Sequence, residues 1–142
     1  MTTQAIIEVY IFKTNGPKKT PLFLLMKRTE ERGGFWQPLT GKVEYGETKT
    51  RAIEREVGEE TGIVDFLEIY DPGYAFYFKD KKHSNCEHVF GLRVADDTKV
   101  KLSDEHETMT WTNFREATKK LAWEENRRGL KLLNNMIGQA FK

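Results

Sequence analysis

The segment GKVEYGETKTRAIEREVGEETGI, residues 41–63, concentrates six glutamates in one short stretch of chain. Good helix formers fill residues 48–61 and Gly62 follows them as a stop signal, so we expect a helix over residues 48–61. An ion pair between Glu47 and Arg51 would support its first turn. Gly58 opposes the helix by roughly 1 kcal/mol relative to alanine.

Three of these glutamates, Glu56, Glu59 and Glu60, stand at positions i, i+3 and i+4, so they project from one face of the expected helix. Like charges at this spacing cost a few tenths of a kcal/mol per pair unless a cation lies between them. Hard divalent cations bind carboxylate oxygens, and Mg²⁺ commonly bridges carboxylates to substrate phosphates. The pattern therefore suits either a metal site for phosphate chemistry or a solvated acidic face.

Runs rich in β-branched and aromatic residues predict strands in the remainder of the chain. Predicted strands cover residues 4–13, 21–28, 63–70, 74–79, 87–94, 100–102 and 108–112. A break is expected at residues 14–17, a loop at 29–34, and helices at 114–121 and 124–137. Strands that precede and follow a central helix predict an α/β fold with helices packed on a mixed β-sheet.

Length, charge and cysteine content limit the class of protein. With 142 residues, 38% of them hydrophobic and 32% charged, the chain has the size and composition of one globular domain. A net charge of +1 gives no overall attraction to nucleic acid, which is not an expected partner. Cys86 is the single cysteine, which excludes an intrachain disulfide. We see no signal peptide and no membrane-spanning run, and expect a cytoplasmic protein.

Read from Gly41, the acidic segment fits a longer pattern, G-x5-E-x7-R-E-U-x-E-E-x-G-U, in which U is a bulky aliphatic residue. Every specified position matches, from Gly41 through Glu47 and Arg55 to Gly62 and Ile63. The chain therefore resembles the Nudix hydrolase superfamily, with the Nudix box at residues 41–63. Fixed offsets at so many positions make a chance match very rare.

The resemblance implies a Nudix-type α/β/α sandwich over residues 1–142, in which the box forms a loop-helix-loop. It implies hydrolysis of phosphoric anhydride bonds with one to three Mg²⁺ or Mn²⁺ ions. The catalytic and metal-binding acids would be Glu56, Glu59 and Glu60, held in place by Glu47 and Arg55. Further metal ligands would be the main-chain carbonyl of Thr40 and Glu105, with Glu105 also a candidate general base and Asp104 its substitute.

Four further stretches resemble the bacterial dihydroneopterin triphosphate and dATP pyrophosphohydrolase branch: MKR at 26–28, FWQPLTGKVEYGET at 35–48, LSDEH at 102–106 and the later WEENRRGLKLL. By position, Arg28 would contact a phosphate or the substrate, and Thr40 the substrate or a metal. Trp36 would stack on a heterocycle, although an aromatic residue before a turn also suits a core position. Arg28 also suits a plain strand-end cation, and His106 a place near the substrate.

The expected function is Mg²⁺-dependent cleavage of a nucleoside or pterin triphosphate, similar to dATP or dihydroneopterin triphosphate, into monophosphate and pyrophosphate. Tyr77, past the box, instead favours a hydrolase of dinucleoside polyphosphates of the diadenosine tetraphosphate type. A non-catalytic nucleotide-binding Nudix domain and an RNA-directed hydrolase are further alternatives. The expected partner is a small polyphosphate substrate, and the sequence sets no oligomeric state.

Overall fold

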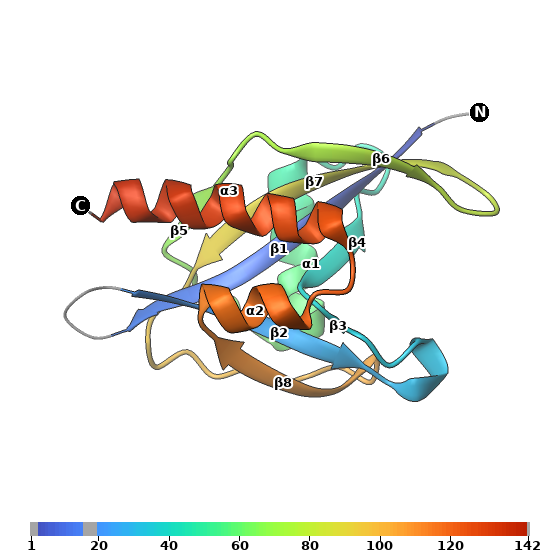
Figure 1. Cartoon of the computed structure of the whole chain (residues 1–142). Helices are drawn as coiled ribbons and strands as arrows, with labels where there is room; N and C mark the ends of the chain where they lie inside the picture. The colour runs from blue at the N-terminus through green and yellow to red at the C-terminus, as the bar shows by residue number, and fades with distance from the viewer. Residues whose placement is uncertain (1–2, 16–19, 142) are drawn as a thin grey trace.

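The fold is a mixed β-sheet with helices on both faces, seen in a computed structural model that describes residues 3–15 and 20–141 (Figure 1). The elements in chain order are β1 (Thr3–Asn15), β2 (Thr20–Arg28), the short 3₁₀ helix η1 (Glu30–Arg32), β3 (Trp36–Gln37), β4 (Leu39–Lys42), α1 (Lys49–Thr61), β5 (Glu68–Tyr70), β6 (Ala75–Lys79), β7 (Ser84–Arg93), β8 (His106–Thr112), α2 (Phe114–Lys120) and α3 (Glu124–Ala140). The eight strands among these residues form a single sheet.

Strand β1 is the centre of the sheet, whose main order is β3-β2-β1-β7-β5. It pairs in parallel with β7 from Thr3–Ser84 to Phe12–Arg93, whereas its pairings with β2 and β4 are antiparallel. The pairing of β1 with β4 places Thr40 opposite Glu8. Because successive residues of a strand face opposite sides of the sheet, Thr40 and the adjacent Gly41 face different layers.

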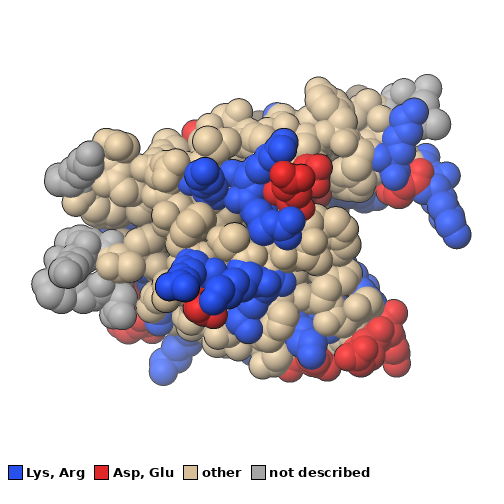
Figure 2. Space-filling view, in the orientation of Figure 1, with Lys and Arg blue, Asp and Glu red and all other residues tan. Residues whose placement is uncertain are grey.

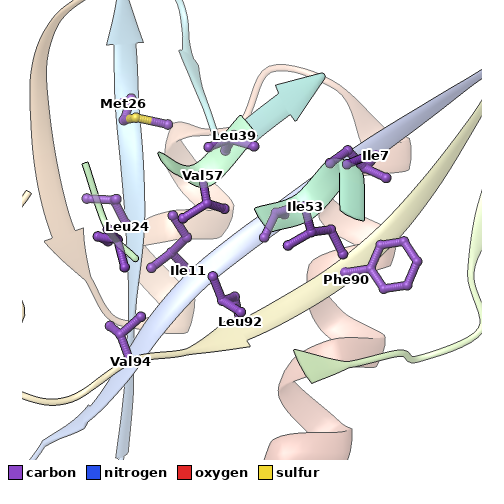
Figure 3. Packing of buried hydrophobic residues seen from close by; sticks show 13 residues of the cluster. Ile7, Ile11, Leu24, Met26, Leu39, Ile53, Val57, Phe90, Leu92 and Val94 are labelled. Atoms are coloured by element: carbon purple, nitrogen blue, oxygen red, sulfur yellow. The ribbon is translucent and has the colours of Figure 1, made fainter. Parts of the chain in front are cut away.

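Each face of the sheet has its own apolar core. Helix α1 covers one face with Ala52, Ile53 and Val57, which pack on side chains of β1, β2 and β7 such as Ile11 (Figure 3). Helices α2 and α3 cover the other face, where they lie in front of the sheet in Figure 1. Each fully buried aliphatic side chain contributes about 1.5–3 kcal/mol. The predicted α/β/α sandwich is confirmed.

The ends of α1 follow from its sequence. Thr48 caps the start, because its hydroxyl oxygen accepts a hydrogen bond from the amide of Arg51 at 3.1 Å. Such a cap contributes about 1 kcal/mol. At the other end Gly62 adopts the left-handed conformation, with φ of 74°, which glycine takes without a steric penalty. The helix predicted over residues 48–61 is therefore confirmed within one residue.

Some local predictions were wrong. The strand predicted at residues 63–70 begins only at Glu68, and no strand forms at residues 100–102. There the amides of Lys101 and Ser103 donate hydrogen bonds to the carbonyls of Thr61 and Glu60 in the last turn of α1. These amides are therefore not available to pair with a neighbouring strand. The loop expected at 29–34 contains η1, and the short strands β3 and β4 were not predicted. The break expected at 14–17 lies partly outside the described residues.

Basic side chains gather over α2 and α3 (Figure 2). Two of them form exposed ion pairs within their helix, Lys119 with Glu116 at 3.5 Å and Arg128 with Glu124 at 3.1 Å. Exposed pairs of this kind contribute about 0–1 kcal/mol. The described helices include none with the length and apolarity needed to cross a membrane.

Candidate active site

Arg55 ties the loop before α1 to the helix. Its Nε and Nη2 donate to the two carboxylate oxygens of Glu47 at 2.8 and 2.9 Å, and Nη2 also donates to the carbonyl of Lys42 at 2.8 Å. These bonds lower the pKa of Glu47 to about 2. The predicted pair between Glu47 and Arg51 was wrong, because the bidentate geometry of Arg55 takes both oxygens of Glu47.

Glu56 is held between Arg55 and the backbone of β4. Arg55 Nη1 donates to Glu56 Oε1 at 2.7 Å, and a side chain on Gly41 would collide with the Glu56 carboxylate. Burial raises the pKa of Glu56, Arg55 opposes that rise, and the charges of Glu59 and Glu105 add to it. Arg55 Nη1 also lies 3.6 Å from Glu59, whose side chain is mostly exposed.

Glu60 is positioned from the β8 side of the site. The hydroxyl of Ser103 donates to Glu60 Oε2 at 2.6 Å, and Nδ1 of His106 lies 3.5 Å from the same oxygen. The amide nitrogen of Gln37 lies 3.1 Å from Nε2 of His106. Because an amide nitrogen only donates, His106 Nε2 accepts and the proton of the neutral ring is on Nδ1, toward Glu60. Burial lowers the pKa of His106, the charge of Glu105 opposes this, and the charges of Arg28 and Arg32 add to the lowering.

Glu105, distant from the box in sequence, lies near Glu60. Burial raises the pKa of Glu60, the hydrogen bond from Ser103 opposes that rise, and the charge of Glu105 adds to it. Arg32 Nη1 lies 3.5 Å from Glu105 Oε1 and offsets part of this negative charge. The neighbouring Asp104 is exposed, so of the two loop acids Glu105 is the one drawn toward the helix.

The carboxylates of Glu56, Glu59, Glu60 and Glu105 provide the oxygen ligands that a hard cation prefers. Across residues 3–15 and 20–141, no three His, Cys, Asp or Glu side chains converge as metal ligands. Arg55 instead supplies the positive charge beside Glu56 and Glu59. Burial first, and then the charges of neighbouring glutamates, raise the pKa values of Glu56 and Glu60, and a divalent cation held by carboxylate oxygens would favour their ionised forms.

A pocket of about 540 Å³ is lined by both aromatic and polar side chains. Its aromatic lining consists of Phe35, Phe76, Tyr77, Phe78 and Trp123. The rings of Phe35 and Trp123 meet edge to face with centroids 4.8 Å apart, while Tyr77 is 76% exposed. Flat faces around an open cavity suit a planar, partly apolar ligand such as a heterocyclic ring.

Polar groups connect the pocket to the acids. Arg28, Gln37 and Thr40 line it, and Gln37 contacts His106, whose Nδ1 lies 3.5 Å from Glu60 Oε2 without a hydrogen bond. The buried Nε of Arg28 has no hydrogen-bond partner within the described residues, which leaves it free to donate to a ligand. Arg28 and Thr40 thus both line the pocket, and their contact with a substrate stays a prediction.

The structure places Trp36 outside the pocket. Its indole packs on the core beneath α2 and α3, with Lys120 Nζ 4.8 Å from the ring centroid. The stacking predicted for Trp36 is therefore not favoured, because β3 turns this side chain toward α2 while the adjacent Phe35 reaches the pocket. Core packing, the alternative for this residue, fits its contacts.

Several residues of the site were not predicted from the sequence. Ser103 and Gln37 position Glu60 and His106, and the acid Glu87 lines the pocket. The signal for Glu87 is a charged residue within a strand in which most residues are buried. Ser103 and Gln37 carry no comparable signal, because polar residues in loops and short strands are common.

The fold and the acidic helix held by Arg55 are features of one protein class. Comparison with known proteins identifies that class. The model of the NUDIX domain family matches residues 4–133, most of the chain. The chain therefore belongs to the Nudix family of hydrolases. An octanoyltransferase of Myxococcus xanthus is 34% identical over 127 residues, covering 88% of this chain and 35% of that protein. The chain spans about a third to a half of the curated relatives it matches.

Solved structures share the fold. The C. elegans Ap4A hydrolase in a binary complex has a TM-score of 0.84 at 21% identity, with 96% of this chain and 99% of that chain covered. The E. coli dihydroneopterin triphosphate pyrophosphohydrolase has a TM-score of 0.76 at 24% identity, with the same coverage. At these sequence identities the similarity establishes the fold only. The substrate has to be inferred from the residues of the site.

Proposed function

We propose that the chain is a divalent-metal-dependent pyrophosphohydrolase that cleaves a nucleoside or pterin triphosphate into a monophosphate and pyrophosphate. One observation supports this proposal: Gln37, which lines the pocket together with Arg28, contacts His106, and His106 Nδ1 lies 3.5 Å from Glu60 on α1. The buried Nε of Arg28 has no partner among the described residues. Carboxylates suit a metal, the arginine suits phosphate, and the pocket suits a flat ring.

The residues that would hold Mg²⁺ or Mn²⁺ are Glu56, Glu59, Glu60, Glu105 and the carbonyl of Thr40. A bound ion of this kind neutralises charge on the phosphate oxygens and lowers the pKa of water. Arg55 and Glu47 keep the helix acids in register with the loop, and Ser103 fixes the rotamer of Glu60. Restricting these side chains before substrate arrives reduces the ordering cost of the reaction.

In the reaction, the oxygen of water forms a bond to phosphorus while the anhydride bond to the leaving pyrophosphate breaks. The water proton passes to a carboxylate, for which we nominate Glu105. It lies near Glu60 but is only half-buried, and its bond with Arg32 is long at 3.5 Å. Arg28 binds the phosphates on the pocket side, where its guanidinium lies 5.5 Å from the Phe35 ring centroid.

A second candidate is hydrolysis of dinucleoside polyphosphates. Tyr77 favours it, because this exposed ring lines the pocket and offers a stacking surface for a second base. The Ap4A hydrolase with the same fold is consistent with it. Octanoyl transfer is not carried over, because the match covers only 35% of that protein. A non-catalytic nucleotide-binding domain is disfavoured by the complete set of box glutamates.

Product analysis with Mg²⁺ tests the proposal and separates the candidates. The panel contains dATP, GTP, dihydroneopterin triphosphate, diadenosine tetraphosphate and ADP-ribose. We expect monophosphate and pyrophosphate in equal amounts from at least one triphosphate. Turnover of diadenosine tetraphosphate alone would favour the second candidate. Binding of these compounds without turnover of any would favour the non-catalytic domain and refute the proposal.

A further inference from the structure

Two acidic side chains outside the metal-binding set lie together beneath the pocket. Glu8 on β1 is fully buried and Glu87 on β7 is 7% exposed. Glu8 pairs with Val89 in the parallel ladder, and Glu87 precedes Val89 by two residues, so both acids face the same layer. Glu87 lines the pocket, and Glu8 lies behind it.

Helix α3 holds this pair in place. Asn126 Nδ2 donates to Glu8 Oε1 at 2.6 Å, and the hydroxyl of Tyr10 donates to the carbonyl of Asn126 at 3.1 Å. The other oxygen, Glu8 Oε2, is buried and has no donor among the described residues. Burying two acids with so few hydrogen-bond partners costs stability. The proposed chemistry at the helix acids does not use this pair.

The pair must share a proton, because two adjacent buried carboxylates cannot both ionise without a large penalty. A proton on Glu8 Oε2 that is donated to Glu87 satisfies the otherwise unpartnered atom. Burial raises the pKa of Glu8 well above its usual range, and the charge of Glu87 adds to this. Glu8 is fully buried and its Oε2 has no other partner among the described residues, whereas Glu87 reaches the pocket, so the proton belongs on Glu8. Glu87 then presents acceptor lone pairs to the pocket.

We propose that Glu87 is the specificity-determining residue of the pocket and accepts two hydrogen bonds from a ring that carries an N–H beside an exocyclic amino group. This inference rests on the proposed function. An ionised carboxylate only accepts, so two parallel N–H donors match it. The 2-amino-4-oxopyrimidine edge of guanine and of pterins has this pattern. Adenine offers an acceptor beside its amino group, and inosine lacks the amino group. Glu8 and Asn126 act as positioning residues.

The pocket walls fit this assignment. Phe35 and Trp123, which meet edge to face, together give a planar ring an apolar wall to lie against. Glu125 also lines the pocket, but it is exposed and stays hydrated. A bound ligand must therefore donate the hydrogen bonds that the Glu87 carboxylate accepts. A ring without these donors leaves the carboxylate without partners and binds less tightly.

The test compares GTP with ITP, which differ by the one amino group, and adds dihydroneopterin triphosphate as the pterin arm. For the wild type we expect kcat/KM for GTP to exceed that for ITP by about tenfold or more. Glu87→Gln should reduce the ratio to below about threefold through loss on GTP, with ITP little changed. Glu125→Gln is the matched control and should keep the ratio. The relative rates on GTP and on dihydroneopterin triphosphate show whether the enzyme prefers a guanine or a pterin.

Binding without turnover separates this inference from the proposed function. Quenching of tryptophan fluorescence by GMP and by IMP should show the same preference and the same loss in Glu87→Gln. Selective binding without hydrolysis of any triphosphate would refute the hydrolase proposal and keep this inference. Equal wild-type values for GTP and ITP, preference for ATP, or a ratio unchanged by Glu87→Gln would overturn the inference while hydrolysis stands. Circular dichroism verifies that each variant is folded.

Discussion

Gly41 and Glu56 lie in direct contact where β4 meets the loop before α1. A Cβ atom built on Gly41 would lie 2.5 Å from both Cγ and Cδ of Glu56, closer than the 3.0 Å that real Cβ atoms essentially never cross. Glycine is therefore required at residue 41 by close approach, and the glutamate occupies the space that a side chain would fill. This contact fixes one carboxylate of the candidate metal site against the sheet.

Replacing Gly41 tests that contact. Gly41→Ala should displace the Glu56 side chain, which is flexible enough to move, and lower kcat/KM by about tenfold or more, or roughly 1.4 kcal/mol, while the fold is kept. Gly58→Ala is the control, because its Cβ would meet only the carbonyl of Ile63 at 3.9 Å. We expect it to stabilise α1 by up to about 1 kcal/mol without loss of activity. Equal activity in both variants would refute the role of the contact.

Acid stability tests the brace between Arg55 and Glu47. Hydrogen bonds from Arg55 lower the pKa of Glu47 from 4.5 to about 2 in the folded state. A depressed pKa contributes stability that is complete above about pH 4.5 and is lost as the pH falls toward 2. The thermal midpoint of Glu47→Gln should therefore lie below that of the wild type at pH 6, and the gap should narrow between pH 4.5 and 3.

A difference in thermal midpoint between wild type and Glu47→Gln that stays constant between pH 4.5 and 3 would contradict the stabilising role of the Arg55–Glu47 pair. Glu54→Gln is the control, because Glu54 is exposed on α1 outside the acidic cluster, and its midpoint should follow the wild type at each pH.

Neighbouring loop acids allow a matched test of the general base. Glu105 is half-buried near Glu60, whereas Asp104 is exposed. Glu105→Gln should lower kcat by tenfold or more, about 1.4 kcal/mol, with a smaller change in KM. Asp104→Asn should leave both constants near wild type. The measurement is steady-state release of pyrophosphate, and a loss below tenfold in Glu105→Gln would assign the acid a minor role.

Features that depend on residues close together in the sequence could be predicted from it. The helix over residues 48–61 and its one-sided acids follow from spacing within a few turns, and the structure confirms the helix. Arg55 was predicted to hold the acids, but its preference for Glu47 depends on how the loop folds back.

Features that join distant segments were less accessible. The sequence predicts a strand at residues 100–102, yet Lys101 and the adjacent Ser103 donate hydrogen bonds to the end of α1, which only the tertiary fold brings close. The acids Glu8 and Glu87 are far apart in sequence and meet because β1 and β7 pair in parallel. Phe35 and Trp36 are adjacent in sequence, and only the direction of β3 decides which of them reaches the pocket.

The central claim, that the acids on α1 perform metal-dependent hydrolysis, is tested most directly by the rate of pyrophosphate release in Glu60→Gln with Mg²⁺ present. The substitution keeps an acceptor for Ser103 and should leave the fold intact by circular dichroism. We predict a fall in kcat of about 10³-fold or more, or roughly 4 kcal/mol, with a similar fall in Glu59→Gln and none in the exposed Glu54→Gln. A Glu60→Gln enzyme that retains kcat within tenfold of wild type would contradict the account.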